Sequence, residues 1–408
     1  INDARGTRGA FDSPDGELVE KGGAAQQLRL SNLTVNYAST PAGPRRLYTY
    51  CPSGSGCNAS LSNGANAFAT TNTAITDAML GSTVSTRTAL INWVRGEDNK
   101  GDELGPTDPP SPNPPYTVRP SIHGDVLHSR PVAINFGTDA APQVVVFYGG
   151  NDGVFRAVNG NQTGAMTSGG VTVAPGGELW GLVLPEHYSK LNRQRVNSPE
   201  LWLPSTALPI AQRKDYFVDG SPGLFQQLKA DGTVDKAYLY LTMRRGGRFI
   251  YALDVSIPTD PKVMWKISSA DPGFAELGQT WSRPRVTLVN GYIDAATRKA
   301  KPVLVFGAGY AGGYAADGKT PIEEDAEPPG TDSMGRGIFV LDAGTGVRVW
   351  SAAYTAGTTA CTGSSTQAAC AVSGMNWGIP ADISFVDRDN DGKTDRFYAA
   401  DLGGNVWR

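Results

Sequence analysis

The stretch LHSRPVAINF, Leu127–Phe136, recurs in altered form three more times along the chain. Its counterparts are VDGSPGLFQQ (Val218–Gln227), TWSRPRVTLV (Thr280–Val289) and NWGIPADISFV (Asn376–Val386). Each copy places a proline directly before an apolar, β-branched run, and the four prolines stand at intervals of 91, 62 and 96 residues: Pro131, Pro222, Pro284 and Pro380. A repeat of this kind predicts a structural unit that is used several times in one fold.

A second element follows about 20 residues after each proline. The copies are QVVVFYGGNDGVFRAVNG (143–160), AYLYLTMRRGGRFIYALDV (237–255), PVLVFGAGYAGG with GRGIFVLDAGTG (302–313 and 335–346), and RFYAADLGGNVWR (396–408). Three copies then add a tryptophan strand, in GELWGLVLP (177–185), KVMWKIS (262–268) and VRVWSAA (347–353). Strand, strand, glycine turn, strand, Asp or Asn turn, and tryptophan strand together predict a four-stranded antiparallel meander.

Radial repetition of such meanders predicts a modified β-propeller, so the fold class is dominated by β-structure. A sandwich of unrelated strands is the alternative, but it does not explain the recurring proline, glycine turn and tryptophan. We expect the blades to occupy residues 121–408, with insertions at 186–215, 310–335 and in the loop 361–370. Four blades do not readily close a ring, so we expect the last blade to be truncated and further blades to lie outside this sequence; blades hidden in residues 1–120 are the alternative.

Residues 1–120 predict a separate N-terminal segment that packs on the propeller. A helical period runs through Gly16–Leu30, and two short helices are predicted near Ala74–Gly81 and Thr86–Gly96, each ended by a glycine. The proline-rich stretch Gly105–Pro120 predicts a stiff connector.

The composition favours a β-protein without a nucleic-acid partner. The 408 residues include 50 glycines and 28 prolines, only 18% are charged, and the net charge is −3, which gives no electrostatic support for nucleic-acid binding. No apolar run approaches 18 residues, so we expect no transmembrane segment. The chain begins at Ile1 without a signal-peptide pattern, and we expect it to start inside a longer polypeptide or after processing.

Four cysteines form two close pairs, Cys51 with Cys57 and Cys361 with Cys370, each in a loop rich in small residues. Their spacings match neither zinc knuckles nor a redox Cys-x-x-Cys motif. We therefore predict two local disulfides and an oxidising compartment. Four unrelated thiols in a cytosolic protein are the alternative.

The stretch VDRDNDGKTDRFY, Val386–Tyr398, has the spacing of a calcium-binding loop. Calcium takes six to eight oxygen ligands, and such loops supply them from positions 1, 3, 5, 7 (a carbonyl) and 9, with a glycine at position 6. The residues at positions 1, 3, 5, 7 and 9 are Asp387, Asp389, Asp391, Lys393 and Asp395, and Gly392 is at position 6.

Position 12 holds Tyr398 instead of the bidentate glutamate of an EF-hand, and both flanks alternate like strands. We therefore predict an EF-hand-like Ca²⁺ loop within a β-hairpin, closed by Asp395, with micromolar to millimolar affinity. A solvated acidic turn is the alternative. Magnesium fits less well because it demands near-octahedral geometry.

Other charged stretches give weaker predictions. GNDG (Gly150–Gly153) predicts a hairpin turn, ADGKTPIEEDAEPP (Ala316–Pro329) a solvated insertion, and RRGGR (Arg244–Arg248) a turn with exposed charge. EDNKGDE (Glu97–Glu103) is a weak second cation loop. Structural roles are expected for all three histidines, which lack zinc spacing: His123, His128 and His187.

Several of these motifs together resemble the C-terminal propeller domain of the PilY type IV pilus biogenesis factors and tip adhesins. They are GDVLHSRPV (124–132), FYGGNDGVFRAVNG (147–160), RRGGRFIYALDV (244–255), GRGIFVLDAGTG (335–346), and the DRDNDGKTD loop followed by DLGGNVWR. The upstream stretches RRLYTY and LINWVRGEDN also look like the segment that precedes that propeller.

The resemblance implies an exported, pilus-associated protein of the periplasm, outer membrane or cell surface, which is not an enzyme. It would support pilus assembly by opposing retraction and would contribute to surface adhesion and twitching motility. The implied partners are pilins or minor pilins and a host or surface receptor, and the calcium ligands carry over onto the five positions named above. A quinoprotein dehydrogenase-like propeller enzyme is the alternative function; it commonly has an adjacent-cysteine disulfide, and this sequence has no Cys-Cys dipeptide.

Overall fold

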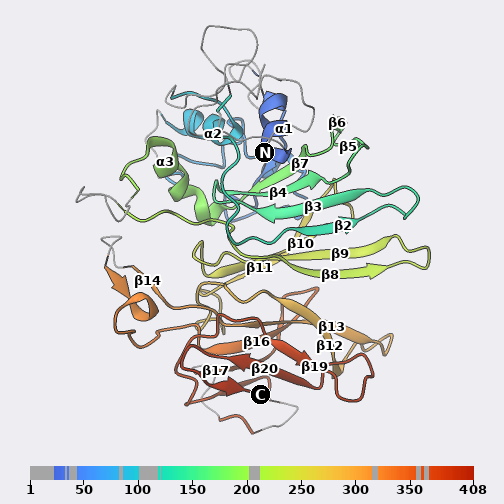
Figure 1. The fold of residues 1–408 in the computed structure, drawn as a ribbon, viewed down its shortest axis with the longest axis vertical. Helices are drawn as coiled ribbons and strands as arrows, with labels where there is room; N and C mark the ends of the chain where they lie inside the picture. The colour runs from blue at the N-terminus through green and yellow to red at the C-terminus, as the bar shows by residue number, and fades with distance from the viewer. Residues whose placement is uncertain are drawn as a thin grey trace.

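The computed structural model describes residues 23–32, 35, 44–81, 86–100, 118–119, 121–201, 212–314, 320–354, 360–362 and 367–408. Within these ranges, four antiparallel sheets follow one another in chain order along the long axis of the molecule (Figure 1). We call them blades 1 to 4. The prediction of a β-dominated fold of repeated antiparallel meanders is confirmed.

Each complete blade is a four-stranded meander that begins one residue after its repeat proline. Blade 1 contains β2 (Val132–Asn135), β3 (Val144–Gly149), β4 (Val154–Asn159) and β7 (Glu178–Val183). Blade 2 contains β8 (Gly223–Leu228), β9 (Val234–Leu241), β10 (Phe249–Asp254) and β11 (Lys262–Ser268). Blade 3 contains β12 (Arg285–Ile293), β13 (Ala300–Gly307), β16 (Gly337–Asp342) and β17 (Arg348–Ala353).

Blade 4 is shorter. It contains β19 (Ser384–Val386), β20 (Arg396–Ala400) and β21 (Val406–Trp407). Two hairpins stand beside the blades: β5 (Met166–Ser168) with β6 (Val171–Val173), and β14 (Gly313–Tyr314) with β15 (Pro321–Ile322), which leads into η3 (Glu323–Asp325).

The third strand of each complete blade is buried on both faces. In β10, Phe249, Tyr251 and Leu253 pack into the core shared with blade 1, whereas Ile250 and Ala252 pack into the core shared with blade 3. Because neither face meets water, these strands read as continuous apolar runs instead of alternating ones. The apolar runs of the third strands therefore form the contacts between neighbouring blades.

Close approach of the backbone explains the glycines at strand ends. A Cβ atom on Gly149, the last residue of β3, would lie 1.9 Å from the carbonyl oxygen of Val218, which precedes blade 2. Gly307, the last residue of β13, stands in the same relation to Ile379 before blade 4, at 2.3 Å. Only glycine allows the end of a strand in one blade to approach the segment that leads into the next blade this closely.

The far face of blade 1 is covered by residues that precede the blades. Phe68, Leu90 and Trp93 share a core with Val154 and Val183 of blade 1. Helix α2 (Arg87–Arg95) lies in this layer and ends at Gly96, so the helix predicted at Thr86–Gly96 is confirmed. Helix α1 (Gly23–Asn32) overlaps the predicted helical period, of which residues 16–22 lie outside the described ranges.

The predicted helix at Ala74–Gly81 is wrong, because the structure forms turns there. The guanidinium of Arg87 donates to the carbonyl oxygens of Thr70, Asn72 and Ile75, which are thereby tied outside a helix. A segment this short also gains too few helical hydrogen bonds to offset the cost of nucleation. Most of the proline-rich connector lies outside the described residues.

Helical structure was not foreseen in the first insertion, where η2 (Pro185–His187) leads into α3 (Tyr188–Val196). Only Tyr188 and Leu191 of α3 are buried, so its apolar period is too weak to be seen in the sequence. No helix in the described part of the chain has the length and apolar character needed to cross a bilayer.

The outer edge of every complete blade is covered by an added segment. Strand β1 (Leu47–Tyr48) pairs in parallel with β7, and β18 (Ala369–Ala371) pairs in parallel with β17. On blade 2, the amide of Leu61 donates to the carbonyl of Pro261 and the amide of Val263 donates to the carbonyl of Ala59. These additions keep unpaired main-chain groups of the last strands from solvent.

Candidate metal centre

The aspartate loop connects β19 to β20 at the surface of blade 4. Phe385 faces Phe397 across the hairpin, and both rings pack against the core shared with blade 3. The amide of Asp395 donates to the carbonyl of Val386 at 2.9 Å and closes the loop. The strands on both sides agree with the predicted hairpin context and differ from the helices that flank an EF-hand loop.

Three carboxylates of the loop converge. Asp387, Asp389 and Asp395 each offer one oxygen, and these oxygens lie within 4.8 Å of one another. Among the described residues, this is the one group of three or more Asp, Glu, His or Cys side chains with that geometry. All three residues are exposed, so an ion would enter directly from solvent.

The backbone of the loop bends to bring these groups together. Asn390 and Gly392 adopt φ angles of 60° and 82°, in the left-handed region. The amide of Gly392 then donates to Asp387 Oδ2 at 2.8 Å, and the amide of Arg388 donates to Asp395 Oδ2 at 2.8 Å. A carboxylate oxygen has two lone pairs, so one amide contact leaves capacity for an ion.

Asp391 and Lys393 are placed differently from the other predicted ligands. The Lys393 ammonium donates to Asp391 Oδ2 at 2.6 Å, and the Lys393 amide donates to Asp391 Oδ1 at 2.8 Å. These hydrogen bonds lower the pKa of Asp391 below its usual range. The structure therefore brings together Asp387, Asp389 and Asp395, and directs the carboxylate of Asp391 to the lysine side chain.

The donor set fits a hard cation. Three carboxylates supply only oxygen atoms, which calcium prefers, and the flexible surface loop does not impose octahedral geometry. Asp387, Asp389 and Asp395 would hold the ion, and Asp391 could join them once it leaves Lys393. A bound calcium ion would supply the positive charge that offsets the repulsion among these carboxylates.

A contact that the sequence did not reveal attaches the loop to blade 3. Thr394 is buried although its neighbours in the loop are exposed or half-buried. Its hydroxyl lies 2.7 Å from that of Thr287 on β12, and its amide donates to the carbonyl of Leu288. A single polar threonine between two acidic positions gives no sequence signal for such a contact.

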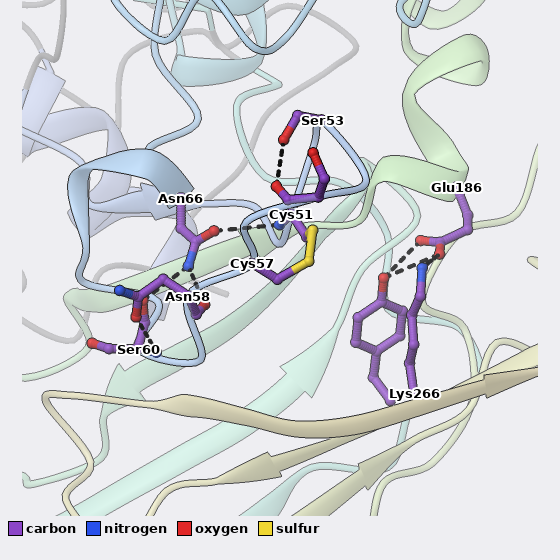
Figure 2. Close-up of a disulfide and its surroundings, with 10 residues drawn as sticks. Cys51, Ser53, Cys57, Asn58, Ser60, Asn66, Glu186 and Lys266 are labelled. Carbon is purple, nitrogen blue, oxygen red and sulfur yellow. Dashed lines mark hydrogen bonds and ion pairs between the residues drawn. A yellow bond between two sulfur atoms is a disulfide. The ribbon is translucent and has the colours of Figure 1, made fainter.

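Both predicted disulfides are confirmed. Cys51 is bonded to Cys57 and Cys361 to Cys370. Figure 2 shows the first bond beside Asn66, whose side chain accepts from the Cys51 amide and donates to the carbonyls of Asn58 and Ser60. This disulfide loop lies between β1, which covers blade 1, and residues 59–61, which cover blade 2.

Close to the first disulfide, Glu186 accepts hydrogen bonds from Tyr251 and Lys266 of blade 2.

The three histidines contact other protein groups. The ring of His123 bonds to the Gly124 carbonyl and the Tyr148 hydroxyl, and burial, together with the charge of Arg156, lowers its pKa to about 4. His187 is fully buried against the Gly246 carbonyl, and burial lowers its pKa well below the usual range. His128 Nδ1 lies 2.6 Å from Asp219 Oδ2.

The remaining charged stretches have mainly structural contacts. In GNDG, the Asn151 side chain links Asp219 to the Phe217 amide, and Asp152 pairs with Arg156. In RRGGR, the Arg244 guanidinium lies 4.1 Å from the ring centroid of Trp281. The weak cation loop at 97–103 and the acidic insertion at 316–329 both fall partly outside the described residues.

A buried charge network in blade 1 was missed at the sequence level. Glu178 accepts two hydrogen bonds from Arg45 and lies 3.2 Å from Arg156, which also pairs with Asp152. Burial raises the pKa of Glu178, but the arginines outweigh it and hold that pKa below its usual range. The alternation of charges compensates the network and supports a structural role.

Comparison with curated proteins identifies relatives among pilus factors. The chain is 24% identical over 344 residues to the type IV pilus biogenesis factor PilY1 of Pseudomonas aeruginosa strain UCBPP-PA14, covering 78% of this chain and 22% of that protein. It is 26% identical over 223 residues to a PilY1 homolog of Xylella fastidiosa, covering 48% of this chain and 15% of that protein. The chain thus spans about a fifth of the length of the first relative. No family model matches.

Two solved structures are similar over part of the chain. The crystal structure of the P. aeruginosa PilY1 C-terminal domain matches 65% of this chain and 38% of that one, with 20% identity and a TM-score of 0.37. A quinohemoprotein alcohol dehydrogenase from Comamonas testosteroni matches 69% of this chain and 42% of that one, with 13% identity and a TM-score of 0.27.

Proposed function

The sequence relationships support a PilY-family C-terminal domain, and on that basis we propose that this chain acts in type IV pilus biogenesis. The observation that carries the proposal is the match to PilY1 over 78% of the chain.

The role we propose is that of a calcium-regulated binding module. The domain supports pilus assembly by opposing retraction, and it contributes to surface adhesion and twitching motility. Calcium bound by Asp387, Asp389 and Asp395, with Asp391 and the Lys393 carbonyl completing the site, fixes the β19–β20 hairpin in one conformation. Three convergent carboxylates support this part of the proposal.

The proposed location is outside the cytoplasm, on the cell surface or in the periplasm, in association with the pilus. Two disulfides support an oxidising compartment. The proposed partners are pilins or minor pilins, with a host or surface receptor. The surface position of the aspartate loop supports a role in contacts between proteins, because a bound ion there would change an exposed hairpin.

A pilus count tests the function. Cells that carry Asp387→Ala in the full protein are expected to show altered surface piliation and twitching, whereas Asp139→Ala, at an exposed loop position of blade 1, is expected to behave as wild type. Normal piliation in an Asp387→Ala strain whose protein no longer binds calcium would contradict the regulatory role. Normal piliation after deletion of the whole gene would contradict a role in pilus biogenesis.

We further propose that the domain is not an enzyme. The relatives are named as biogenesis factors, which supports a binding role. The purified protein is expected to lack the visible absorbance of a bound quinone. Such an absorbance would instead support a quinoprotein dehydrogenase.

A further inference from the structure

A groove of about 540 Å³, which we call the cationic groove, lies between α3, the segment 212–216, the turn after β9 and the hairpin strand β14. Helix α3 and β14 stand on the same side of the blades in Figure 1. Five cations line the groove: Lys190, Arg193, Arg213, Lys214 and Arg245. Among the described lining residues, Asp215 is the one acid, and its carboxylate pairs with Arg193. Because the whole chain has a net charge of −3, the groove is a local reversal of that charge.

Three of these cations gather around Tyr216. The Lys190 ammonium donates to the Tyr216 carbonyl oxygen at 2.9 Å. The Lys214 ammonium lies 5.7 Å and the Arg245 guanidinium 5.9 Å from the centroid of the Tyr216 ring. A carbonyl and an aromatic ring attract a cation and fix its position, but they carry no net charge. Tyr216 therefore holds three positive charges together without neutralising them.

Lys190 is held by neutral groups. Besides the Tyr216 carbonyl, its ammonium donates to the carbonyl oxygen of Gly246 at 2.9 Å. Within the described residues, no carboxylate lies at ion-pair distance from this ammonium. An ammonium carries three donors, so one remains for a ligand. Burial lowers the pKa of Lys190, as expected of a poorly solvated charge that a bound anion would stabilise.

Two acids at the rim of the groove show which chemical group its cations accept. The Lys214 ammonium pairs with the Asp125 carboxylate, and both side chains are about one-third exposed. The Arg245 guanidinium lies 3.7 Å from the Asp325 carboxylate. Ion pairs in contact with solvent contribute little to stability, so an incoming carboxylate can replace them. The same two acids would repel a polyanion much longer than the groove, such as a nucleic acid.

We propose that the cationic groove binds an acidic peptide segment of a partner protein. Carboxylates of the segment bind Lys190 and Arg245, and the residues between them contact the rings of Tyr216 and Tyr314. Arg213, whose guanidinium lies 4.1 Å from the Tyr314 ring centroid, adds a further positive charge. Tyrosine and arginine are enriched in protein interfaces, and a peptide uses both the rings and the charges, whereas an inorganic anion uses the charges only. The groove shares no residue with the aspartate loop, so peptide binding and calcium binding can be tested separately.

Peptide binding to the intact chain tests the proposal. The probe is a short fluorescein-labelled peptide in which aspartate and glutamate alternate with leucine, followed by fluorescence anisotropy at low ionic strength. This peptide is expected to bind, whereas the same peptide with asparagine and glutamine in place of the acids is expected not to bind. Arg245→Gln is expected to weaken binding about tenfold, because it removes a charged hydrogen-bond donor. The matched control Lys236→Gln, at an exposed position of β9, is expected to bind as wild type.

Asp125→Asn is expected to change the affinity in the opposite direction. It removes the acid that competes for the Lys214 ammonium, so the acidic peptide is expected to bind about threefold more tightly. A groove whose cations only stabilise the fold would not give this gain.

Peptide recognition by the groove is overturned by any of three results: no binding to the folded wild type, wild-type affinity in Arg245→Gln, or equal binding of the neutral peptide. Tighter binding of a heparin fragment, or of vesicles that contain phosphatidylglycerol, would also overturn it and would assign the groove to an anionic sugar or a lipid surface. Circular dichroism checks that each variant is folded, and Lys214→Gln, which is also expected to weaken binding, replaces Arg245→Gln if that variant does not fold.

Discussion

The backbone amide of Thr394 donates to the carbonyl oxygen of Leu288 at 2.8 Å, which joins the aspartate loop of blade 4 to β12 of blade 3. Thr394 stands between Lys393 and Asp395, two of the predicted calcium ligands. An ion that orders these neighbours also orders the residue that connects the two blades. Calcium occupancy is therefore expected to act on the seam between blades 3 and 4 as well as on the loop.

Asp387→Asn is expected to weaken calcium binding at the loop at least tenfold, because it removes one of three convergent charges while keeping an amide oxygen. Calorimetric titration of the purified chain with Ca²⁺ measures the affinity. The control is Asp139→Asn, which alters an exposed acid of blade 1. Unchanged affinity in Asp387→Asn would place the ion elsewhere.

The hydroxyl contact between Thr287 and Thr394 is suited to a double-mutant cycle. Thr287→Val and Thr394→Val are each expected to lower the free energy of unfolding by about 1 kcal/mol, since each removes the hydrogen bond between the two hydroxyls, while the Thr287 hydroxyl also lies 3.3 Å from the Leu288 carbonyl oxygen. The double variant is expected to lose less than the sum, with a coupling energy of about 1 kcal/mol measured by urea denaturation. Fully additive losses would mean that the two hydroxyls do not interact.

Gly149→Ala is expected to lower the free energy of unfolding by about 1–3 kcal/mol, because its Cβ would lie 1.9 Å from the Val218 carbonyl oxygen. Chemical denaturation measures the loss. The matched control is Gly164→Ala, whose Cβ would meet only the side chain of Asn161, at 3.6 Å. Equal stability of the two variants would show that the approach between blades 1 and 2 is looser than described.

Stability is expected to fall as the pH decreases from about 6.5 to 4, in part because of His123. Its pKa is lowered to about 4 in the folded state, so over this range the unfolded chain binds a proton that the folded protein excludes. The histidine contributes up to about 3 kcal/mol to this loss. In His123→Gln the decrease, followed by denaturation at pH 8, 6 and 4.5, is expected to be correspondingly smaller. An identical pH profile would rule out this role of the histidine.

The blades could be predicted from the sequence because each repeats the same pattern of proline, buried third strand and Asp or Asn turn. Pro131, Pro222 and Pro284 each stand one residue before the first strand of a blade, and the apolar run of each third strand is buried on both faces. Asn159, Asp254 and Asp342 end the third strands, and each holds amides of the following turn, as the Asp or Asn turn in the repeat predicts.

Other features depend on contacts between residues far apart in the chain. The Arg87 side chain holds the Ile75 carbonyl in the turns at 74–81, and a strand about a hundred residues earlier covers Thr394. The convergence of Asp387, Asp389 and Asp395 followed from their spacing. The direction of Asp391 toward Lys393 did not follow from spacing. It depends on whether the Asp391 carboxylate turns to the Lys393 ammonium or to the other three aspartates. The division at residue 120 stays a prediction.

Both disulfides stand beside segments that cover the last strands of blades, and this position has a consequence for solubility. Cys370 lies in β18, which covers blade 3, and the Cys51–Cys57 bond closes the loop between the covers of blades 1 and 2. Reduction is expected to loosen these covers and to expose strand edges that can pair between molecules, so that the protein aggregates while its blades remain folded. Light scattering with circular dichroism, with and without reductant, measures this; a reduced protein that stays monomeric would show that the covers hold without their covalent bonds.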